Sequence, residues 1–284
     1  MSSWRLDKAR LDFAMQFGEE VVQTSGIGDP PADPLLILKA EGKYIKAFGD
    51  DFGDAFDGRL EYHEPRYFLF YNTKYNDWPH IGSQHPKVRF TIAHELGHYF
   101  LDDHRAYLNK GGKPHFCLTE FTSDNLVERE ADAFASGMLM PSFMLCKLVN
   151  KAEPSLESIK TTRKSFDVSL TSMMIRWSQL CDFPCATLAI KNKCIEWGFA
   201  SEGFKRAGAY KILRKNIVSE DAIKFVDADP SFQEYREGSG WGIAEYWLDI
   251  PKTNVDVHED YVVIPSTRIL LVFLTASEGE LFHD

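Results

Sequence analysis

The chain has 284 residues, 44% hydrophobic and 26% charged, a composition typical of a globular protein that excludes a disordered one. Its 32 basic and 42 acidic side chains give a net charge of −10, which excludes a broad phosphate-binding surface. No apolar run is long enough for a signal-peptide core at the N-terminus or for a membrane span elsewhere. The chain also has five cysteines, an odd number that does not suggest a set of paired disulfides. Together these features predict a cytoplasmic protein that does not contact a membrane.

The N-terminal part predicts a helix followed by short strands. Residues 4–24 have the apolar spacing of an amphipathic helix, and the proline-containing segment GIGDPPADP after them predicts a loop. The segments PLLILKA, GRLEYHE and RYFLFYN predict strands, and the last two are close enough to pair as a hairpin. RYFLFYN has two interpretations, an edge strand to which a substrate peptide adds or an ordinary core strand.

Two longer helices are predicted in the middle of the chain. His85 and Pro86 begin the first, which carries FTIAHELGHYF, because proline is favoured in a first helical turn. The polar segment LDDHRAYLNKGGKPHFC predicts an irregular excursion. Ser123 or Asp124 is predicted to cap the second helix, NLVEREADAFASGMLM, which ends at Pro141.

Residues 155–180 predict two short helices separated at FDVS. Residues 147–180 carry six basic and three acidic side chains, a local basic surplus. The segment is therefore either a helix-turn-helix that reads DNA or a small helical subdomain that packs on the preceding domain or docks a substrate. Because its second helix carries Met173, Ile175 and Trp177, it is too apolar for an exposed recognition helix, and we expect no direct nucleic-acid binding.

The C-terminal part has a different texture from about residue 183 onwards. Short apolar runs interrupted by Gly, Asp and Asn predict strands, namely ATLAI, GIAEYWLDI, DYVVIP and RILLVFLTA. The sequence therefore predicts a boundary near residues 180–184 and a β-rich C-terminal domain.

The segment HELGH places His94 and His98 four residues apart. On a helix this spacing puts both imidazoles on one face, where they can bind one metal ion, with Glu95 beside them. In this H-E-x-x-H arrangement two histidines bind zinc and the glutamate is the general base toward water. The alternative is a core or surface helix that carries two histidines by chance. A zinc site with an open position also needs a third protein ligand.

The second helix offers that ligand. One of its faces is mostly small and apolar and should point inward; it consists of Glu128, Ala131, Asp132, Ala135 and Met138. Because an unpaired buried carboxylate is costly, Glu128 is predicted to bind the metal, and Asp132 to accept the free ring N–H of a ligand histidine. Glu130 is the rival ligand, but it lies about 200° around the helix from Glu128 and is predicted to be solvated.

Three side chains near the motif are candidates for stabilising the oxyanion that forms during peptide hydrolysis, namely Tyr99, His104 and His115. Each has the alternative interpretation of a surface or packing residue, and the sequence does not choose among them.

Three segments resemble the ImmA/IrrE family of metallopeptidases: RFTIAHELGHYFLDDH, EREADAFASGMLMP and FDVSLTSMMIRWSQL. The resemblance extends over roughly residues 55–180 and includes both halves of the metal site in the family's order. It implies a minimal zincin fold with His94, His98 and Glu128 as metal ligands, and with Glu95 as general base. It also implies a substrate class, since family members cleave helix-turn-helix transcriptional repressors of stress responses or mobile elements. In the radiation-response members a GAF-like sensor domain follows the peptidase part.

The combined interpretation is an α+β zinc metallopeptidase with a zincin-like domain at residues 1–145, a helix-turn-helix-like linker at 146–182 and a β-rich sensor or substrate-recognition domain at 183–284. The expected cofactor is zinc, with manganese as the alternative. The expected partner is a transcriptional repressor that the enzyme cleaves at a specific site. The alternative function is a non-catalytic regulator that binds a repressor or DNA through the same fold. Such a regulator would not need Glu95.

Overall fold

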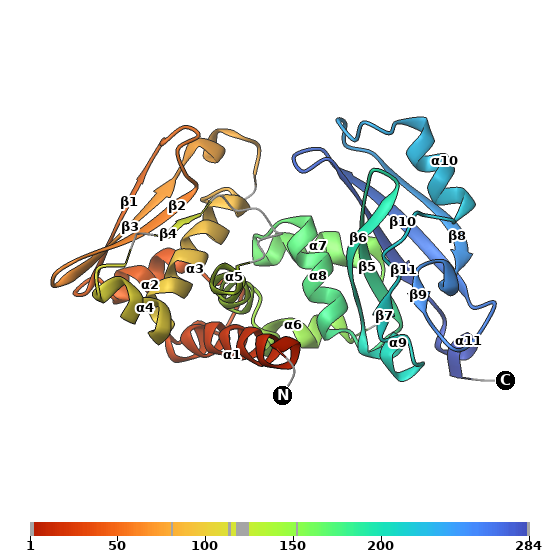
Figure 1. The fold of residues 1–284 in the computed structure, drawn as a ribbon, viewed down its shortest axis with the longest axis horizontal. Helices are drawn as coiled ribbons and strands as arrows, with labels where there is room; N and C mark the ends of the chain where they lie inside the picture. The colour runs from red at the N-terminus through yellow and green to blue at the C-terminus, as the bar shows by residue number, and fades with distance from the viewer. Residues whose placement is uncertain (1–2, 81, 113–114, 118–124, 152, 283–284) are drawn as a thin grey trace. The chain divides into compact units, whose positions relative to one another are not determined.

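The computed structural model has an α+β fold with a β-rich C-terminal region, as predicted (Figure 1). It describes the chain with short gaps, over residues 3–80, 82–112, 115–117, 125–151 and 153–282. Contacts divide the chain into two compact units, each made of two segments: Met1–Met144 with Arg163–Ser169, and Leu145–Thr162 with Leu170–Asp284. The three predicted domains stay predictions, because compactness alone does not show which segments fold independently.

The first unit contains a four-stranded sheet in the order β1–β3–β2–β4. Its strands are β1 (Ile45–Asp50), β2 (Gly58–His63), β3 (Arg66–Asn72) and β4 (His115–Cys117). The hairpin predicted for GRLEYHE and RYFLFYN is confirmed, since β2 and β3 pair antiparallel. The edge-strand interpretation of RYFLFYN is wrong, because β3 lies between β2 and a parallel β1 and buries Leu69 completely.

The helices of this unit are α1 (Ser3–Thr24), α2 (Pro34–Ala40), α3 (Pro86–Phe100), α4 (Asp102–Asn109) and α5 (Leu126–Leu139), with a 3-10 turn at Lys74–Asp77. The predictions for α1 and α3 are confirmed. The strand predicted for PLLILKA is wrong, because Asp33 accepts a hydrogen bond from the Leu35 amide at 2.9 Å and caps a helix that begins at Pro34. The irregular excursion predicted after α3 is also wrong in part, since it forms α4 and β4.

The start of α5 differs from its prediction. Ser123 and Asp124, the predicted caps, lie outside the described residues. The cap is Asn125, whose side chain accepts a hydrogen bond from the Val127 amide at 3.1 Å. The apolar part of the predicted inward face is confirmed, because three of its members are completely buried: Ala131, Ala135 and Met138.

Two glycines let α1 and α5 approach closely. A Cβ atom on Gly137 would lie 2.0 Å from the Met15 carbonyl oxygen, and one on Gly18 would lie 2.2 Å from the Phe134 carbonyl oxygen. Real Cβ atoms do not approach backbone that closely, so the two helices are held at a distance that only glycine permits. This contact places α5, and with it the carboxylates of the candidate site, relative to α1.

Gly137→Ala is therefore expected to lower the free energy of unfolding by about 2 kcal/mol or more, because α1 has to shift to admit the methyl group. Chemical denaturation monitored by circular dichroism measures this loss. Gly28→Ala is the matched control, since a Cβ atom there meets no atom within 4 Å. Equal stabilities of the two variants would contradict the close approach of α1 and α5.

The second unit is built on a five-stranded antiparallel sheet in the order β6–β5–β11–β10–β8. Its strands are β5 (Cys185–Lys191), β6 (Cys194–Ala200), β8 (Glu237–Ile243), β10 (Asp256–Ile264) and β11 (Ile269–Thr275), and a separate pair is formed by β7 (Lys211–Ile212) and β9 (Leu248–Asp249). Three of the predicted strands, ATLAI, DYVVIP and RILLVFLTA, are confirmed. GIAEYWLDI is not one strand, because a 3-10 turn at Ala244–Tyr246 separates β8 from β9.

The remaining helices are α6 (Ser142–Val149), α7 (Leu156–Phe166), α8 (Leu170–Leu180), α9 (Glu202–Arg206), α10 (Glu220–Ala228) and α11 (Glu278–Phe282). The two helices predicted around FDVS are thus confirmed as α7 and α8. In α8, Met173, Met174 and Trp177 are buried, so the side chains that made a recognition helix improbable belong to the core. Within the described residues no single helix is long and apolar enough to cross a membrane, although the bent pair α5 and α6 qualifies by length and composition alone.

Candidate metal centre

The helix α3 supplies most of the candidate site. It begins where the sequence predicted, since His85 accepts a hydrogen bond from the Lys87 amide and Pro86 occupies the first helical position. A Cβ atom on Gly97 would lie 3.1 Å from Ala131 Cα of α5, so the two helices approach closely at this glycine. That approach brings Glu128 of α5 within reach of the α3 histidines.

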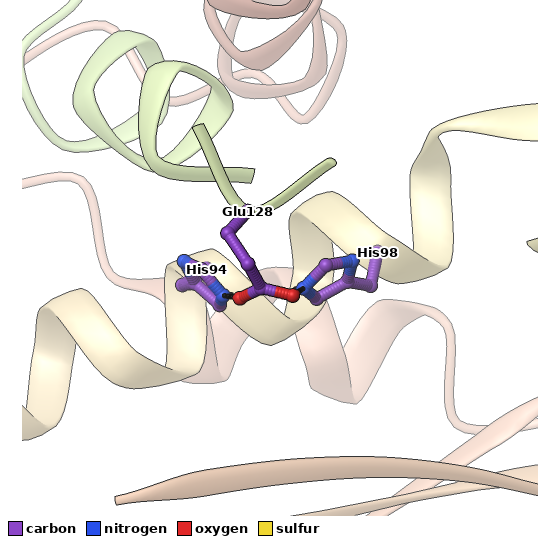
Figure 2. A group of neighbouring side chains, drawn as sticks. All are labelled: His94, His98 and Glu128. Atoms are coloured by element: carbon purple, nitrogen blue, oxygen red, sulfur yellow. Dashed lines mark hydrogen bonds and ion pairs between the residues drawn. The ribbon is translucent and has the colours of Figure 1, made fainter. Parts of the chain in front are cut away.

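His94, His98 and Glu128 form the cluster that could hold a metal ion (Figure 2). Their ligand atoms all lie within 4.8 Å of one another. The two Nε2 atoms are 3.1 Å apart, and the Glu128 carboxylate presents one oxygen to each ring, at 3.2 Å from His94 and 3.7 Å from His98. Tetrahedral zinc with bonds of about 2.0–2.1 Å separates its ligand atoms by roughly 3.4 Å, so the spacing of the donor atoms is close to that of a divalent metal site.

Asp132 lies where the sequence predicted, one turn after Glu128 on α5. Its Oδ1 is 2.8 Å from Nδ1 of His94. Because a carboxylate oxygen only accepts hydrogen bonds, this ring nitrogen carries the proton, and Nε2 keeps a lone pair directed into the cluster. A nitrogen lone pair beside a second imidazole and a carboxylate is the chemistry of a cation site.

Glu95 lies beside the cluster and is completely buried. Neither of its carboxylate oxygens has a hydrogen-bond partner within the described ranges. A Cβ atom on Gly58, the first residue of β2, would lie 2.5 Å from Oε1, so the sheet covers this carboxylate closely. Burial raises the pKa of Glu95 to about 8; the interaction with His94 opposes the shift and the Glu128 carboxylate adds to it. A carboxyl whose pKa lies near neutrality can both hold and release a proton, as a general acid–base group must.

For the metal-free protein, the raised pKa of Glu95 predicts a stability that falls as the pH rises from about 4.5 to 8. The native carboxyl keeps its proton in this range, whereas the unfolded one releases it near 4.5, so the stabilisation is complete below 4.5 and is lost as the pH rises through 8. Glu95→Gln removes this dependence. The variant should be more stable than the wild type by on the order of 3 kcal/mol near neutral pH, at about 1.4 kcal/mol per pKa unit.

Urea denaturation after chelation, at several pH values between 5 and 8, measures this difference. The advantage of Glu95→Gln over the wild type should grow steadily with pH. An advantage that is constant across the range would show that the native carboxyl ionises normally and is not desolvated.

Glu130 does not have the environment that the sequence predicted. It is only 5% exposed, and the prediction of a solvated side chain is wrong. Its carboxylate contacts Arg10 of α1, with 2.8 Å between Oε2 and Nη2, and its Oε2 lies 3.0 Å from Nε2 of His104. Glu130 therefore faces α1 and α4, on the other side of His98 from the metal cluster. The helical spacing correctly predicted that Glu130 points away from Glu128. Its burial is due to α1, which the spacing could not predict.

The three oxyanion candidates have different positions. Tyr99 is buried, and its hydroxyl donates a hydrogen bond to Glu41 at 2.9 Å, so its polar group is already engaged. His104 is buried between His98 and Glu130. His115 begins β4, and its side chain lies outside what the structure describes. Neither Tyr99 nor His104 belongs to the metal cluster itself.

Comparison with known proteins was decisive for one part of the chain. The family model Peptidase_M78, described as the IrrE N-terminal-like domain, matches residues 80–178. Residues 80–178 belong to this family. The predicted resemblance is thereby confirmed. The match extends over about a third of the chain and includes α3 and α5, the two helices that form the cluster. The match to the IrrE N-terminal-like domain supports the assignment of a peptidase-type enzyme that uses a divalent metal.

One solved structure extends the similarity beyond the IrrE N-terminal-like domain. It is a Mycobacterium tuberculosis transcriptional regulator, and the similarity covers 96% of this chain and 78% of that chain, with a TM-score of 0.53. The sequence identity is 13%, so the comparison shows a shared fold alone. No curated protein matched the chain. The individual roles assigned to the site residues of the IrrE N-terminal-like domain stay predictions.

Proposed function

We propose that the chain is a zinc-dependent endopeptidase, with manganese as the alternative metal. One observation carries the proposal: two imidazoles and a carboxylate converge beside a buried glutamate whose oxygens have no hydrogen-bond partner among the described residues. His94, His98 and Glu128 would hold the metal and leave a fourth position open. A structural zinc site does not need a buried carboxylate such as Glu95 beside the metal, and neither does a hydrophobic core.

The chemistry follows from the donor set and from Glu95. A bound zinc ion supplies a Lewis acid that activates water and polarises the peptide carbonyl. Glu95 takes the proton from the attacking water and passes it to the leaving amine. Burial raises the pKa of Glu95 in the metal-free chain, and the positive charge of a bound metal would lower it toward the ionised form that accepts a proton. Asp132 keeps the His94 ring oriented.

The proposed substrate is a transcriptional repressor of the helix-turn-helix type, cut at a specific site in a stress or mobile-element response in the cytoplasm. The resemblance of the metal-site segments to the repressor-cleaving family supports this class. The β-rich unit would then recognise the substrate or sense a signal. A non-catalytic regulator is the second candidate, because the solved protein with a similar fold is named a transcriptional regulator.

The test is co-expression of the full chain with candidate repressors, followed by mass spectrometry of the repressor fragments. The purified chain is also stripped with a chelator and reloaded with zinc or manganese. Repressor cleavage that stops on chelation and returns with one of the metals supports the endopeptidase. A chain that binds metal and repressor but leaves every repressor intact would favour the regulator.

A further inference from the structure

Behind the metal cluster, a second set of buried side chains contacts His98. Nδ1 of His98 lies 3.0 Å from Nδ1 of His104, and Nε2 of His104 lies 3.0 Å from Oε2 of Glu130. Arg10 donates from Nη2 to the same Glu130 oxygen at 2.8 Å and from Nε to the other oxygen. His98 and His104 are 0% and 3% exposed. The four side chains form one line of contacts that ends at His98.

The positions of the protons follow from the acceptor at the end of this line. Glu130 is paired with Arg10, so its carboxylate is ionised and its oxygens only accept hydrogen bonds. Nε2 of His104 must therefore carry a proton. In a neutral imidazole the other nitrogen is then an acceptor, so Nδ1 of His104 accepts from Nδ1 of His98. His98 in turn keeps a lone pair on Nε2, the atom that faces the cluster.

The two histidines of the cluster are thus oriented in two ways from the same helix. His94 donates directly to Asp132 of α5. On its Nδ1 side, His98 contacts His104, and the other ring nitrogen of His104 contacts Glu130 of α5. In both cases a carboxylate, directly or through His104, places the ring proton on Nδ1, so that the Nε2 lone pair faces the cluster.

We infer that His104, held by Glu130 and Arg10, is a positioning residue that fixes His98 in the tautomer and orientation of a metal ligand. The inference rests on the proposed metal centre and adds to it a relay from α1 to the metal. The relay gives a physical reason for a buried glutamate, a buried histidine and an arginine on three different elements to meet behind His98. It also assigns a function to Glu130 other than that of a metal ligand.

The test is the zinc affinity of the full-length metal-free chain, measured by competition with a chromogenic chelator. His104→Phe keeps the ring volume and removes both hydrogen bonds, and it should weaken zinc binding by roughly 10- to 100-fold. Glu130→Gln should also weaken binding, because an amide can donate to Nε2 of His104 and reverse its tautomer. Asp132→Asn, which removes the carboxylate partner of His94, is the matched reference.

Combined substitutions distinguish a relay from a general loss of packing. The double variant His104→Phe with Glu130→Gln should bind zinc no more weakly than His104→Phe alone, because Glu130 acts only through His104. The effects of His104→Phe and Asp132→Asn should instead multiply, since they act on different ligands. Multiplying effects of His104→Phe and Glu130→Gln would overturn the relay.

A second measurement does not depend on the variants being folded. In the zinc-loaded wild type labelled with ¹⁵N-histidine, NMR should show His98 protonated at Nδ1 and His104 protonated at Nε2. A proton on Nδ1 of His104 would overturn the inference.

If the wild type binds zinc and His104→Phe binds it equally well, the relay is wrong and the metal centre stands. If zinc binding depends on His104 but no repressor is cut, the relay stands and the peptidase proposal fails.

Discussion

Glu95→Gln is expected to abolish cleavage of a repressor substrate, by roughly 10²- to 10⁴-fold, while the zinc content of the purified protein stays at the wild-type level. Glutamine has nearly the same shape as glutamate but cannot take a proton from water. Metal binding should persist because Glu95 is not a member of the cluster of His94, His98 and Glu128. The measurements are the rate of fragment formation by mass spectrometry and zinc per chain by elemental analysis.

Glu20→Gln is the matched control, since Glu20 is an exposed glutamate in the same unit and its loss should leave both quantities unchanged. Circular dichroism verifies that both variants are folded. Cleavage by Glu95→Gln at close to the wild-type rate would show that Glu95 is not the general base. Loss of zinc together with activity would show instead that Glu95 contributes to metal binding.

The parts of the fold that follow from local rules could be predicted from the sequence. The helix α3 begins at a proline after a capping histidine, and β2 and β3 are joined by a turn short enough to require a hairpin. The segment PLLILKA could not be assigned in this way, because a run of four apolar residues suits a buried strand and a buried helix equally. The Asp33 cap and Pro34 decide for the helix, and both are visible in the sequence.

Some features of the candidate site could also be predicted from the sequence, and others could not. The spacing of His94 and His98 is local, and Glu128 could be selected because it shares a face of α5 with small residues that are indeed buried. The environment of Glu130 was not predictable, since its partner Arg10 is 120 residues away on α1. A helical pattern shows which way a side chain points but not which element lies there.

Glycines indicate where two elements approach closely, which hydrophobic periodicity does not show. Gly97 lies within the helix α3 between the two histidines, and a glycine at an interior helical position is a signal of close backbone approach. Gly58 at the start of β2 leaves the space in which the Glu95 carboxylate is enclosed. Neither could be assigned a partner without the structure, because each contact joins elements that are distant in the chain.

Glu128→Gln is expected to lose most of the bound zinc and all peptidase activity, a larger effect on metal content than that of Glu130→Gln or Asp132→Asn. The Glu128 oxygens are the only carboxylate oxygens of the described cluster that lie near both Nε2 atoms, at 3.2 and 3.7 Å. Without the negative charge, two neutral imidazoles remain, which bind zinc weakly. Elemental analysis and chelator competition measure the loss.

Thermal unfolding supplies an independent readout. A ligand at 1,000 times its dissociation constant stabilises the native state by about 4 kcal/mol, so added zinc should raise the melting temperature of the wild type and not that of Glu128→Gln. The melting temperature of the metal-free variant should stay close to that of the metal-free wild type, because the Glu128 side chain is partly exposed.

Glu130→Gln is the comparison: it should retain a weakened zinc response, since Glu130 acts on His98 through His104. A variant pair in which Glu130→Gln loses all zinc and Glu128→Gln keeps it would move the third ligand to Glu130 and require α5 to be turned about its axis.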